Sequence, residues 1–355
     1  MISNFYLYIS WNIDPALYDG FITLRYYSLF FALSFLIGFQ IVKKMFDNES
    51  APVEWMDKLL VYTVLGTILG ARFGHVLFYE PSYYLENISE ILMVWKGGLA
   101  SHGAAVALII SMWIFSKKVT KKKTMWTMDK LVIAVALAAG FIRVGNLMNS
   151  EIVGLRTESE SGFFYKYKAK NQIASFFSLK SEKIHFDETS NDTVINDMKY
   201  IQLKVSIPLG NKKMNPYYSE AFSNAFNFKA IDSDADFFSS INKNDFKVSS
   251  TNELILPIYI ISRIPTQLYE AISYWLIFCF LFWGYWKRDW HLYSGKLFGV
   301  FFTLLFTSRF IVEFFKEHQT LENSSLLTMG QYLSIPLVAV GLYFWIKSKK
   351  IDTYQ

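Results

Sequence analysis

Hydrophobic residues occur in long runs that are separated by short polar stretches. Seven of these runs approach the roughly 20 residues that an α-helix needs to cross the apolar part of a bilayer. They cover residues 24–42, 58–79, 97–116, 128–148, 266–286, 297–315 and 330–346. The pattern predicts an all-α polytopic membrane protein with seven transmembrane helices.

The chain between the fourth and fifth runs has a different character. Residues 156–262 are rich in Lys, Asp, Asn, Ser and Phe, and apolar and polar residues alternate in 200–207 and 253–260. Alternation with a period of two is typical of β-strands. We therefore expect a folded, partly β insert at 156–262, with helices one to four in 1–155 and helices five to seven in 263–355.

Basic residues predict the orientation in the membrane. Groups of Lys and Arg follow the first, third, fifth and seventh helices, at 43–44, 117–123, 287–288 and 347–350. Seven crossings place all four groups on one side, and positive residues mark the cytoplasmic face. The N-terminus and the insert are then extracytoplasmic and the C-terminus is cytoplasmic. Because topology explains the net charge of +5, we expect no nucleic-acid partner.

Motifs for metals and nucleotides are missing from the sequence. Cys279 is the only cysteine, so an intrachain disulfide or Cys–Cys redox pair is excluded. There is no HExxH motif, no glycine-rich phosphate loop and no Cys/His cluster. We expect neither a metal nor another cofactor.

Polar and charged residues within the spans are the candidate functional groups. A charged side chain there costs about 2.5–3.5 kcal/mol, so it requires a partner, a water-filled cavity or a function. The predicted outer halves of the helices contain Arg72, His75, His102, Arg143, Asn146, Asn149, Gln267, Tyr269, Glu270, Arg309 and Glu313.

Three arginines are expected at similar depth. At about 1.5 Å per residue, Arg72, Arg143 and Arg309 lie roughly 18–20 Å from the cytoplasmic ends of their helices. A single pair such as Arg309 with Glu313 is often structural, but three arginines at one level favour a binding cavity. Guanidinium groups bind phosphate bidentately. The nearest phosphate is that of an outer-leaflet phospholipid, so we expect a lipid-phosphate site that includes residues of helices one to four.

Three other classes of protein remain as alternatives. A transporter could place arginines in a central cavity, but it would carry polar residues through both leaflets. A membrane scaffold would not need buried arginines at matched depth. An intramembrane protease is disfavoured because the spans lack a Gly-x-Gly-Asp motif and a metalloprotease motif.

Seven ordered motifs resemble those of the prolipoprotein diacylglyceryl transferase family. The strongest is GFIRVGNLMNSEIVG at 140–154, in which Arg143, Asn146, Asn149, Glu151 and Gly154 match and Ser150 replaces the usual Gly. The others are RYY at 25–27, GARFGHVLFY at 70–79, GGLASHG at 97–103, QLYE at 267–270, RFIVE at 309–313 and MGQ at 329–331. The sequence departs from the family pattern at Ile264 (usually His), Thr266 (usually Ser) and Leu305 (often Tyr), and its insert is longer than usual.

The resemblance implies an enzyme of the bacterial inner membrane that carries out the first step of lipoprotein maturation. Such an enzyme transfers the diacylglyceryl group of phosphatidylglycerol to the lipobox cysteine thiol in the signal peptide of a prolipoprotein. The products are a thioether and glycerol phosphate. The expected partners are phosphatidylglycerol, prolipoprotein signal peptides and the lipid bilayer.

The resemblance also suggests roles for individual residues. Arg143 would bind the lipid phosphate, and Arg309, positioned by Glu313, would stabilise charge on the departing glycerol phosphate. A thiol with an ordinary pKa near 8.5 must lose its proton to react. His102 is the first candidate for the proton acceptor, with Tyr27 or arginine electrostatics as alternatives; a lone membrane histidine is more often structural.

The remaining candidates are assigned to substrate binding. This group consists of Asn146, Glu151, Gly154, Arg72, Gln267 and Tyr269. For Arg72, contact with the head group and a purely structural role are both open.

Overall fold

The computed structural model describes most of the chain and divides it into two compact units. The described residues are 9–20, 23–94, 97–157, 162–195, 198–208, 221–222, 224, 236–239, 247–250, 253–316 and 326–351. One unit, here the sheet unit, comprises Met1–Phe30, Ile142–Ala271 and Phe310–Gln331. The other, the bundle unit, comprises Phe31–Phe141, Ile272–Arg309 and Tyr332–Gln355. Each unit combines segments that are distant in the sequence.

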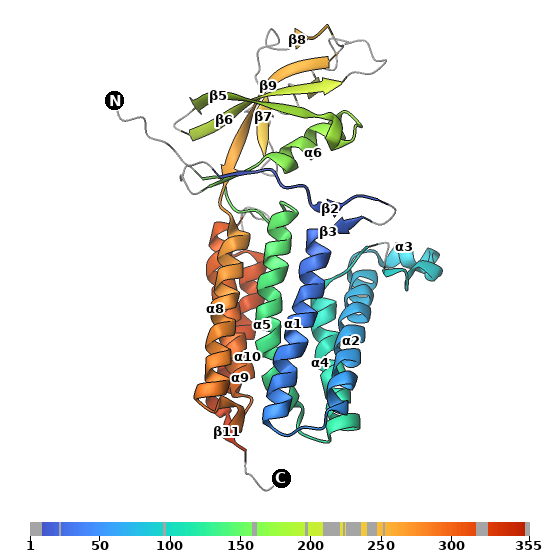
Figure 1. The fold of residues 1–355 in the computed structure, drawn as a ribbon, viewed down its shortest axis with the longest axis vertical. Helices are drawn as coiled ribbons and strands as arrows, with labels where there is room; N and C mark the ends of the chain where they lie inside the picture. Colours follow the sequence, from blue (N-terminus) through green and yellow to red (C-terminus); the bar gives the residue numbers. More distant parts are fainter. Residues whose placement is uncertain are drawn as a thin grey trace, which may run out of the picture. The chain divides into compact units, whose positions relative to one another are not determined.

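Seven helices in the described part of the chain are long and apolar enough to cross a membrane. They are α1 (Tyr26–Asn48), α2 (Glu54–Phe78), α4 (Ser101–Phe115, extended by a π turn at Ser116–Thr120), α5 (Thr124–Met148), α8 (Thr266–Lys287), α9 (Lys296–Val312, extended by a 3-10 turn at Glu313–Phe315) and α10 (Met329–Lys347). The helices are shown in Figure 1. They confirm the seven predicted spans and identify a multi-pass membrane protein.

Helix α4 begins later than predicted. It starts at Ser101 rather than at 97, because Gly97 and Gly98 have φ of +87° and +72°. Such angles lie outside the right-handed helical region and are readily adopted by glycine alone. His102 is therefore the second residue of α4, about 1.5 Å along its axis instead of the expected roughly 8 Å.

Short elements connect these helices. After α2 come α3 (Pro81–Glu86) and a 3-10 turn at Ile88–Glu90. A two-stranded sheet pairs β2 (Ala16–Tyr18) with β3 (Leu24–Arg25), and another pairs β10 (Tyr293–Ser294) with β11 (Lys349–Lys350). A 3-10 turn at Trp290–Leu292 precedes β10.

The bundle unit is held together by an apolar core and by a few buried polar contacts. Its core includes Phe46, Phe115, Ile133, Leu281 and Val300. At the end of α1, the Glu49 carboxylate pairs with Lys130 Nζ of α5 at 2.9 Å and accepts a hydrogen bond from the Tyr285 hydroxyl of α8 at 2.9 Å.

The preceding residue on α5, Asp129, contacts the start of α9. Its carboxylate accepts the backbone N–H groups of Gly295 and Phe298 at 2.7 and 2.8 Å. These contacts occupy N–H donors that a helix N-terminus leaves without intrahelical partners.

The sheet unit is built around a seven-stranded sheet. The main strand order is β1 (Ile9–Trp11), β4 (Phe163–Tyr165), β9 (Glu253–Arg263), β6 (Met198–Pro208) and β5 (His185–Ile195), while β7 (Phe237–Ser239) and β8 (Lys247–Val248) also pair with β9. The β1–β4 pair is parallel and the other pairs are antiparallel. Strands β6 and β9 confirm the two predicted alternating segments.

Register and burial place the core of the sheet unit on one face of β6 and β9. Leu203 lies opposite Ile258, and Val205 lies opposite Leu256. Helix α6 (Lys166–Phe176) lies beside the sheet in Figure 1, and its Ile173 belongs to the same apolar cluster as these residues. A 3-10 turn at Ser181–Lys183 leads from α6 to β5.

Candidate active site

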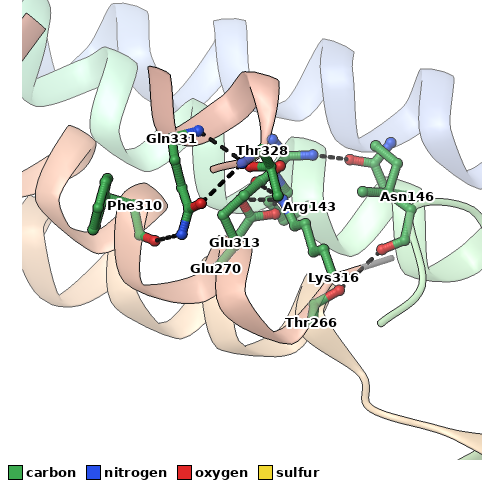
Figure 2. A network of polar contacts seen from close by, with 10 residues as sticks. Arg143, Asn146, Thr266, Glu270, Phe310, Glu313, Lys316, Thr328 and Gln331 are labelled. Carbon is green, nitrogen blue, oxygen red and sulfur yellow. Dashed lines mark hydrogen bonds and ion pairs between the residues drawn. The ribbon is translucent and has the colours of Figure 1, made fainter. Parts of the chain in front are cut away.

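A continuous set of polar contacts begins at Arg143 in the last turns of α5. Its Nε lies 2.9 Å from Glu270 Oε2 on α8, and its Nη1 donates to Asn146 Oδ1 at 3.1 Å. Asn146 is one helical turn later, so both side chains lie on the same face of α5. Asn146 Nδ2 in turn donates to Glu151 Oε1 at 2.8 Å. Figure 2 shows Arg143, Asn146 and Glu270 in close-up.

The guanidinium group is therefore oriented by two partners. Glu270 is completely buried, with 0% of its surface exposed, and it supplies a carboxylate that partly compensates the charge of Arg143. The ion pair with Glu270 and the hydrogen bond to Asn146 together restrain the guanidinium group.

Glu270 and Glu313 share a buried lysine that the sequence did not indicate as functional. Lys316 Nζ lies 2.9 Å from Glu270 Oε1 and 3.4 Å from Glu313 Oε2. Glu313 therefore pairs with Lys316, and its expected role of positioning Arg309 stays a prediction. The 3-10 turn at Glu313–Phe315 brings these two residues, three apart, onto the same side.

The first turn of α8 supports the segment that follows α5. Gln267 Nε2 donates to the carbonyl of Glu151 at 2.6 Å, and Thr266 Oγ1 donates to the carbonyl of Ile152 at 3.0 Å. Gln267 is buried and also accepts a hydrogen bond from the Tyr165 hydroxyl at 3.2 Å. Burial raises the pKa of Tyr165, and the hydrogen bond to Gln267 only partly opposes this shift. Tyr165 therefore stays protonated and remains a donor.

Gly154 lies where three segments of backbone meet. Its N–H donates to the carbonyl of Ile264 at 2.9 Å, and the next N–H, of Leu155, donates to the carbonyl of Phe315 at 2.8 Å. A Cβ at Gly154 would lie 2.6 Å from the Ile264 oxygen and 2.7 Å from the Phe315 oxygen. The position requires glycine because any side chain would push these segments apart. Close packing of the backbone therefore explains the glycine at this position of the motif.

Two more candidates, Tyr27 and Tyr269, lie in the sheet unit. Tyr27, in the first turn of α1, packs beside Gly145 of α5, because a Cβ at Gly145 would lie 2.8 Å from Tyr27 Cδ2. Its ring thus borders the helical turn that carries Arg143 and Asn146. Tyr269 is exposed, with its ring 6.4 Å from that of Phe315.

Helix α10 begins with a reciprocal pair of capping hydrogen bonds, and one of the two capping residues also contacts α9. The Thr328 N–H donates to Gln331 Oε1 at 3.0 Å, and the Gln331 N–H donates to Thr328 Oγ1 at 3.2 Å. This is a capping box with Gln at the third helical position. Gln331 Nε2 also donates to the carbonyl of Phe310 at 3.4 Å, as Figure 2 shows.

The bundle unit contains the other predicted site residues. Arg309 is half-buried on α9. His102 is exposed at the start of α4, where its ring lies 5.2 and 5.8 Å from those of Phe78 and Tyr79. His75 stacks on the same Tyr79 ring at 5.5 Å.

Arg72 is buried among backbone carbonyls. Only 1% of its surface is exposed, and its guanidinium donates to the carbonyls of Glu90, Ile91, Gly97 and Gly98. The group also lies 4.9 Å from the Tyr84 ring. These contacts favour the structural alternative for Arg72, which anchors the connection from α3 to α4.

Comparison with known proteins follows the same motifs along nearly the whole chain. A family model described as prolipoprotein diacylglyceryl transferase matches residues 15–347. The chain belongs to this family.

Individual relatives agree with the family match. The phosphatidylglycerol--prolipoprotein diacylglyceryl transferase of Chloroherpeton thalassium is 33% identical over 97% of this chain and 95% of its own length. The protein of the same name from Porphyromonas gingivalis is 34% identical over 97% of this chain and 95% of its own length. A third, from Tolumonas auensis, is 32% identical over 96% of this chain and 97% of its own length. The predicted family and transferase class are confirmed.

Two departures from the diacylglyceryl transferase pattern have a structural explanation. Ser150, which replaces the usual Gly, has φ of +53°, a left-handed conformation that glycine adopts at no steric cost. Ile264, which replaces the usual His, pairs through its backbone with Gly154 and Leu155. That backbone role does not depend on the side chain.

Lys316 and Glu270 form the ion pairs of the network, and sequence reasoning assigned neither of them a role. One signal could have found Lys316. It is a lysine just beyond the predicted outer end of a span, whereas the four groups of basic residues that follow other spans are predicted to be cytoplasmic.

Proposed function

We propose that this protein transfers the diacylglyceryl group from phosphatidylglycerol to the lipobox cysteine thiol in prolipoprotein signal peptides. The observation that supports this most strongly is the buried network around Arg143, which is built from the family motif at 140–154. The names of the relatives state the same donor and the same class of acceptor. The reaction needs no nucleotide or redox cofactor, because a carbon–sulfur bond replaces a carbon–oxygen bond.

The proposed chemistry is a displacement at the glyceryl carbon that carries the phosphate. The cysteine sulfur forms a bond to this carbon, and the carbon–oxygen bond to phosphate breaks. The electron pair of that bond goes to the leaving glycerol phosphate, and the thiol proton goes to a base or to the leaving phosphate. Thioether and glycerol phosphate account for all atoms of the two substrates.

In this proposal Arg143 binds the phosphate of the lipid. Its orientation by Glu270 and Asn146 supports this role, since a preorganised donor stabilises developing charge without rearranging during the reaction. Asn146 and Glu151 hold Arg143 from the α5 side, while Gln267 and Gly154 fix the backbone that carries Glu151. Arg309 is the second proposed phosphate ligand, and Tyr269 is an exposed candidate for contact with substrate.

Two side chains are proposed as alternative acceptors of the thiol proton. His102 is exposed at the start of α4 and has an imidazole suited to accept a proton near neutral pH. Tyr27, half-buried beside the Arg143 turn, is the alternative. Comparing His102→Gln with Tyr27→Phe over a range of pH would separate them, because only loss of the true base removes the dependence of the rate on deprotonation.

We further propose that the protein resides in the bacterial inner membrane with its N-terminus and its 156–262 insert outside. The asymmetric distribution of Lys and Arg supports this orientation. In a Cys279→Ser background, a cysteine introduced at Lys180 should react with an impermeant maleimide in intact cells. A cysteine introduced at Lys349 should react only after the membrane is permeabilised, and the reverse pattern would reject this topology.

The activity is tested with purified enzyme, phosphatidylglycerol and a synthetic lipobox peptide. Mass spectrometry should show the peptide heavier by one diacylglyceryl group, and a peptide with Ser in place of Cys should remain unmodified. Phosphatidylcholine serves as the comparison donor. An unmodified cysteine peptide in the presence of folded enzyme and phosphatidylglycerol would refute the proposed function.

A further inference from the structure

Lys316 is an unusual lysine because its side chain is buried. Only 6% of its surface is exposed, and a buried ammonium group is costly unless it is paired. Its main chain is fixed independently, since residue 316 forms an isolated antiparallel bridge with Gly154 and its N–H donates to the carbonyl of Glu313 at 3.2 Å. The fold thus directs this one lysine toward the carboxylates of the network.

Glu270 is the link between Lys316 and Arg143. Its two carboxylate oxygens have different cationic partners: Oε1 lies 2.9 Å from Lys316 Nζ, and Oε2 lies 2.9 Å from Arg143 Nε. Figure 2 shows Arg143, Glu270 and Lys316 converging on one point. Lys316 therefore occupies the oxygen that a fork-shaped, two-bond pairing of Arg143 with Glu270 would require.

Lys316 offsets one negative charge among the four residues that these ion pairs join, Arg143, Glu270, Glu313 and Lys316. Arg143 and Lys316 contribute two positive charges, and Glu270 and Glu313 contribute two negative charges. Without the lysine the same four positions would carry one net negative charge. A phospholipid phosphate is also negative, and repulsion between like charges is strong where water is excluded.

We propose that Lys316 is a positioning residue for the Arg143 guanidinium and acts through Glu270. It holds one carboxylate oxygen and offsets the negative charge, so that Arg143 keeps both the orientation and the electrostatic capacity to bind an anionic head group. This inference rests on the proposed role of Arg143 as the phosphate ligand. It assigns Lys316 no contact with the reacting atoms.

The test is the steady-state kinetics of Lys316→Met, which removes the charge and preserves most of the volume. We expect the KM for phosphatidylglycerol to rise by about tenfold to hundredfold, the range for loss of a contact to a charged group, while the KM for the lipobox peptide stays within about twofold. A merely structural role would lower the active fraction and leave both KM values unchanged. Lys316→Arg, which restores the cation, should recover most of the lost affinity.

A double-mutant cycle with Glu270→Gln tests the route of the effect. If Lys316 acts through Glu270, adding Lys316→Met to Glu270→Gln should raise the KM for phosphatidylglycerol much less than it does in the wild type. Additive effects, or coupling to Glu313→Gln alone, would overturn the inference. Lys316→Gln, which keeps a hydrogen-bond donor without the charge, replaces the methionine variant where that variant is not recovered in folded form.

The matched control is Lys130→Met in the bundle unit. Lys130 is equally well buried and pairs with Glu49 at 2.9 Å, but it lies outside the proposed site. The Lys130→Met variant should have lower thermal stability, but its KM values for phosphatidylglycerol and for the lipobox peptide should be unchanged. An inactive Arg143→Ala enzyme with a normal Lys316→Met enzyme would reject this inference alone, whereas a fully active Arg143→Ala enzyme would reject the proposed function of Arg143.

Discussion

The segment from Ser150 to Ile152 shows how single residues carry strain next to the proposed site. Both residues have positive φ, +53° and +56°, and for a β-branched residue such as Ile152 this conformation is uncommon. Glu151 lies between them and accepts hydrogen bonds from Asn146 and Asn149. Strained backbone persists where surrounding contacts over-determine it, and here Gln267 and Thr266 hold the carbonyls of residues 151 and 152.

Ser150→Gly should therefore stabilise the protein by about 1 kcal/mol, because glycine adopts this conformation without a steric penalty. No compensating contact is lost, since Ser150 Oγ is buried without a hydrogen-bond partner among the described residues. Thermal unfolding in detergent measures the change, and activity should be retained. The control Ser34→Gly, inside α1, should destabilise. A lower unfolding temperature for Ser150→Gly would contradict the strain argument.

At the scale of elements, side chains from one helix complete the ends of others. Asp129 of α5 accepts the first N–H groups around α9, and Arg72 of α2 holds the carbonyls between α3 and α4. Gln331 caps its own helix α10 and reaches α9. These polar contacts fix where the spans begin, whereas apolar packing alone would allow them to slide.

Asp129→Ala should consequently destabilise the bundle unit by about 2–3 kcal/mol, because two N–H groups lose a charged acceptor in a buried setting. The measurement is the midpoint of thermal unfolding in a fixed detergent. Asp57→Ala, which removes an exposed carboxylate from α2, should shift the midpoint several times less. Equal shifts for the two variants would show that the contacts of Asp129 do not stabilise α9.

For the whole molecule, local patterns predicted the elements well. Hydropathy located the seven spans to within a few residues, and period-two alternation located β6 and β9, because both signals are contained in neighbouring residues. One error in a span, the start of α4, came from the apolar run continuing through Gly97 and Gly98, whose backbone conformation prevents a helix.

The pairing of charges could not be predicted in the same way. Arg143 and Glu270 are 127 positions apart, and hydropathy contains no information on which distant side chains meet. Motif resemblance identified both residues as matching the family, but it did not indicate that they pair, or that Lys316 joins them. Nor did it indicate that Glu313 pairs with Lys316, three residues later along the 3-10 turn that follows Val312.

The central claim is that Arg143 is required for transfer because it binds the phosphate of the donor lipid. The most direct measurement is thioether formation by Arg143→Ala, compared with Arg288→Ala, which removes an exposed arginine from the end of α8. Both variants should insert into the membrane and unfold cooperatively. We predict that the first loses activity by at least about a hundredfold, as expected for an electrostatic group aimed at the reacting charge, while the second stays near wild type. Near-normal turnover by folded Arg143→Ala would contradict the account.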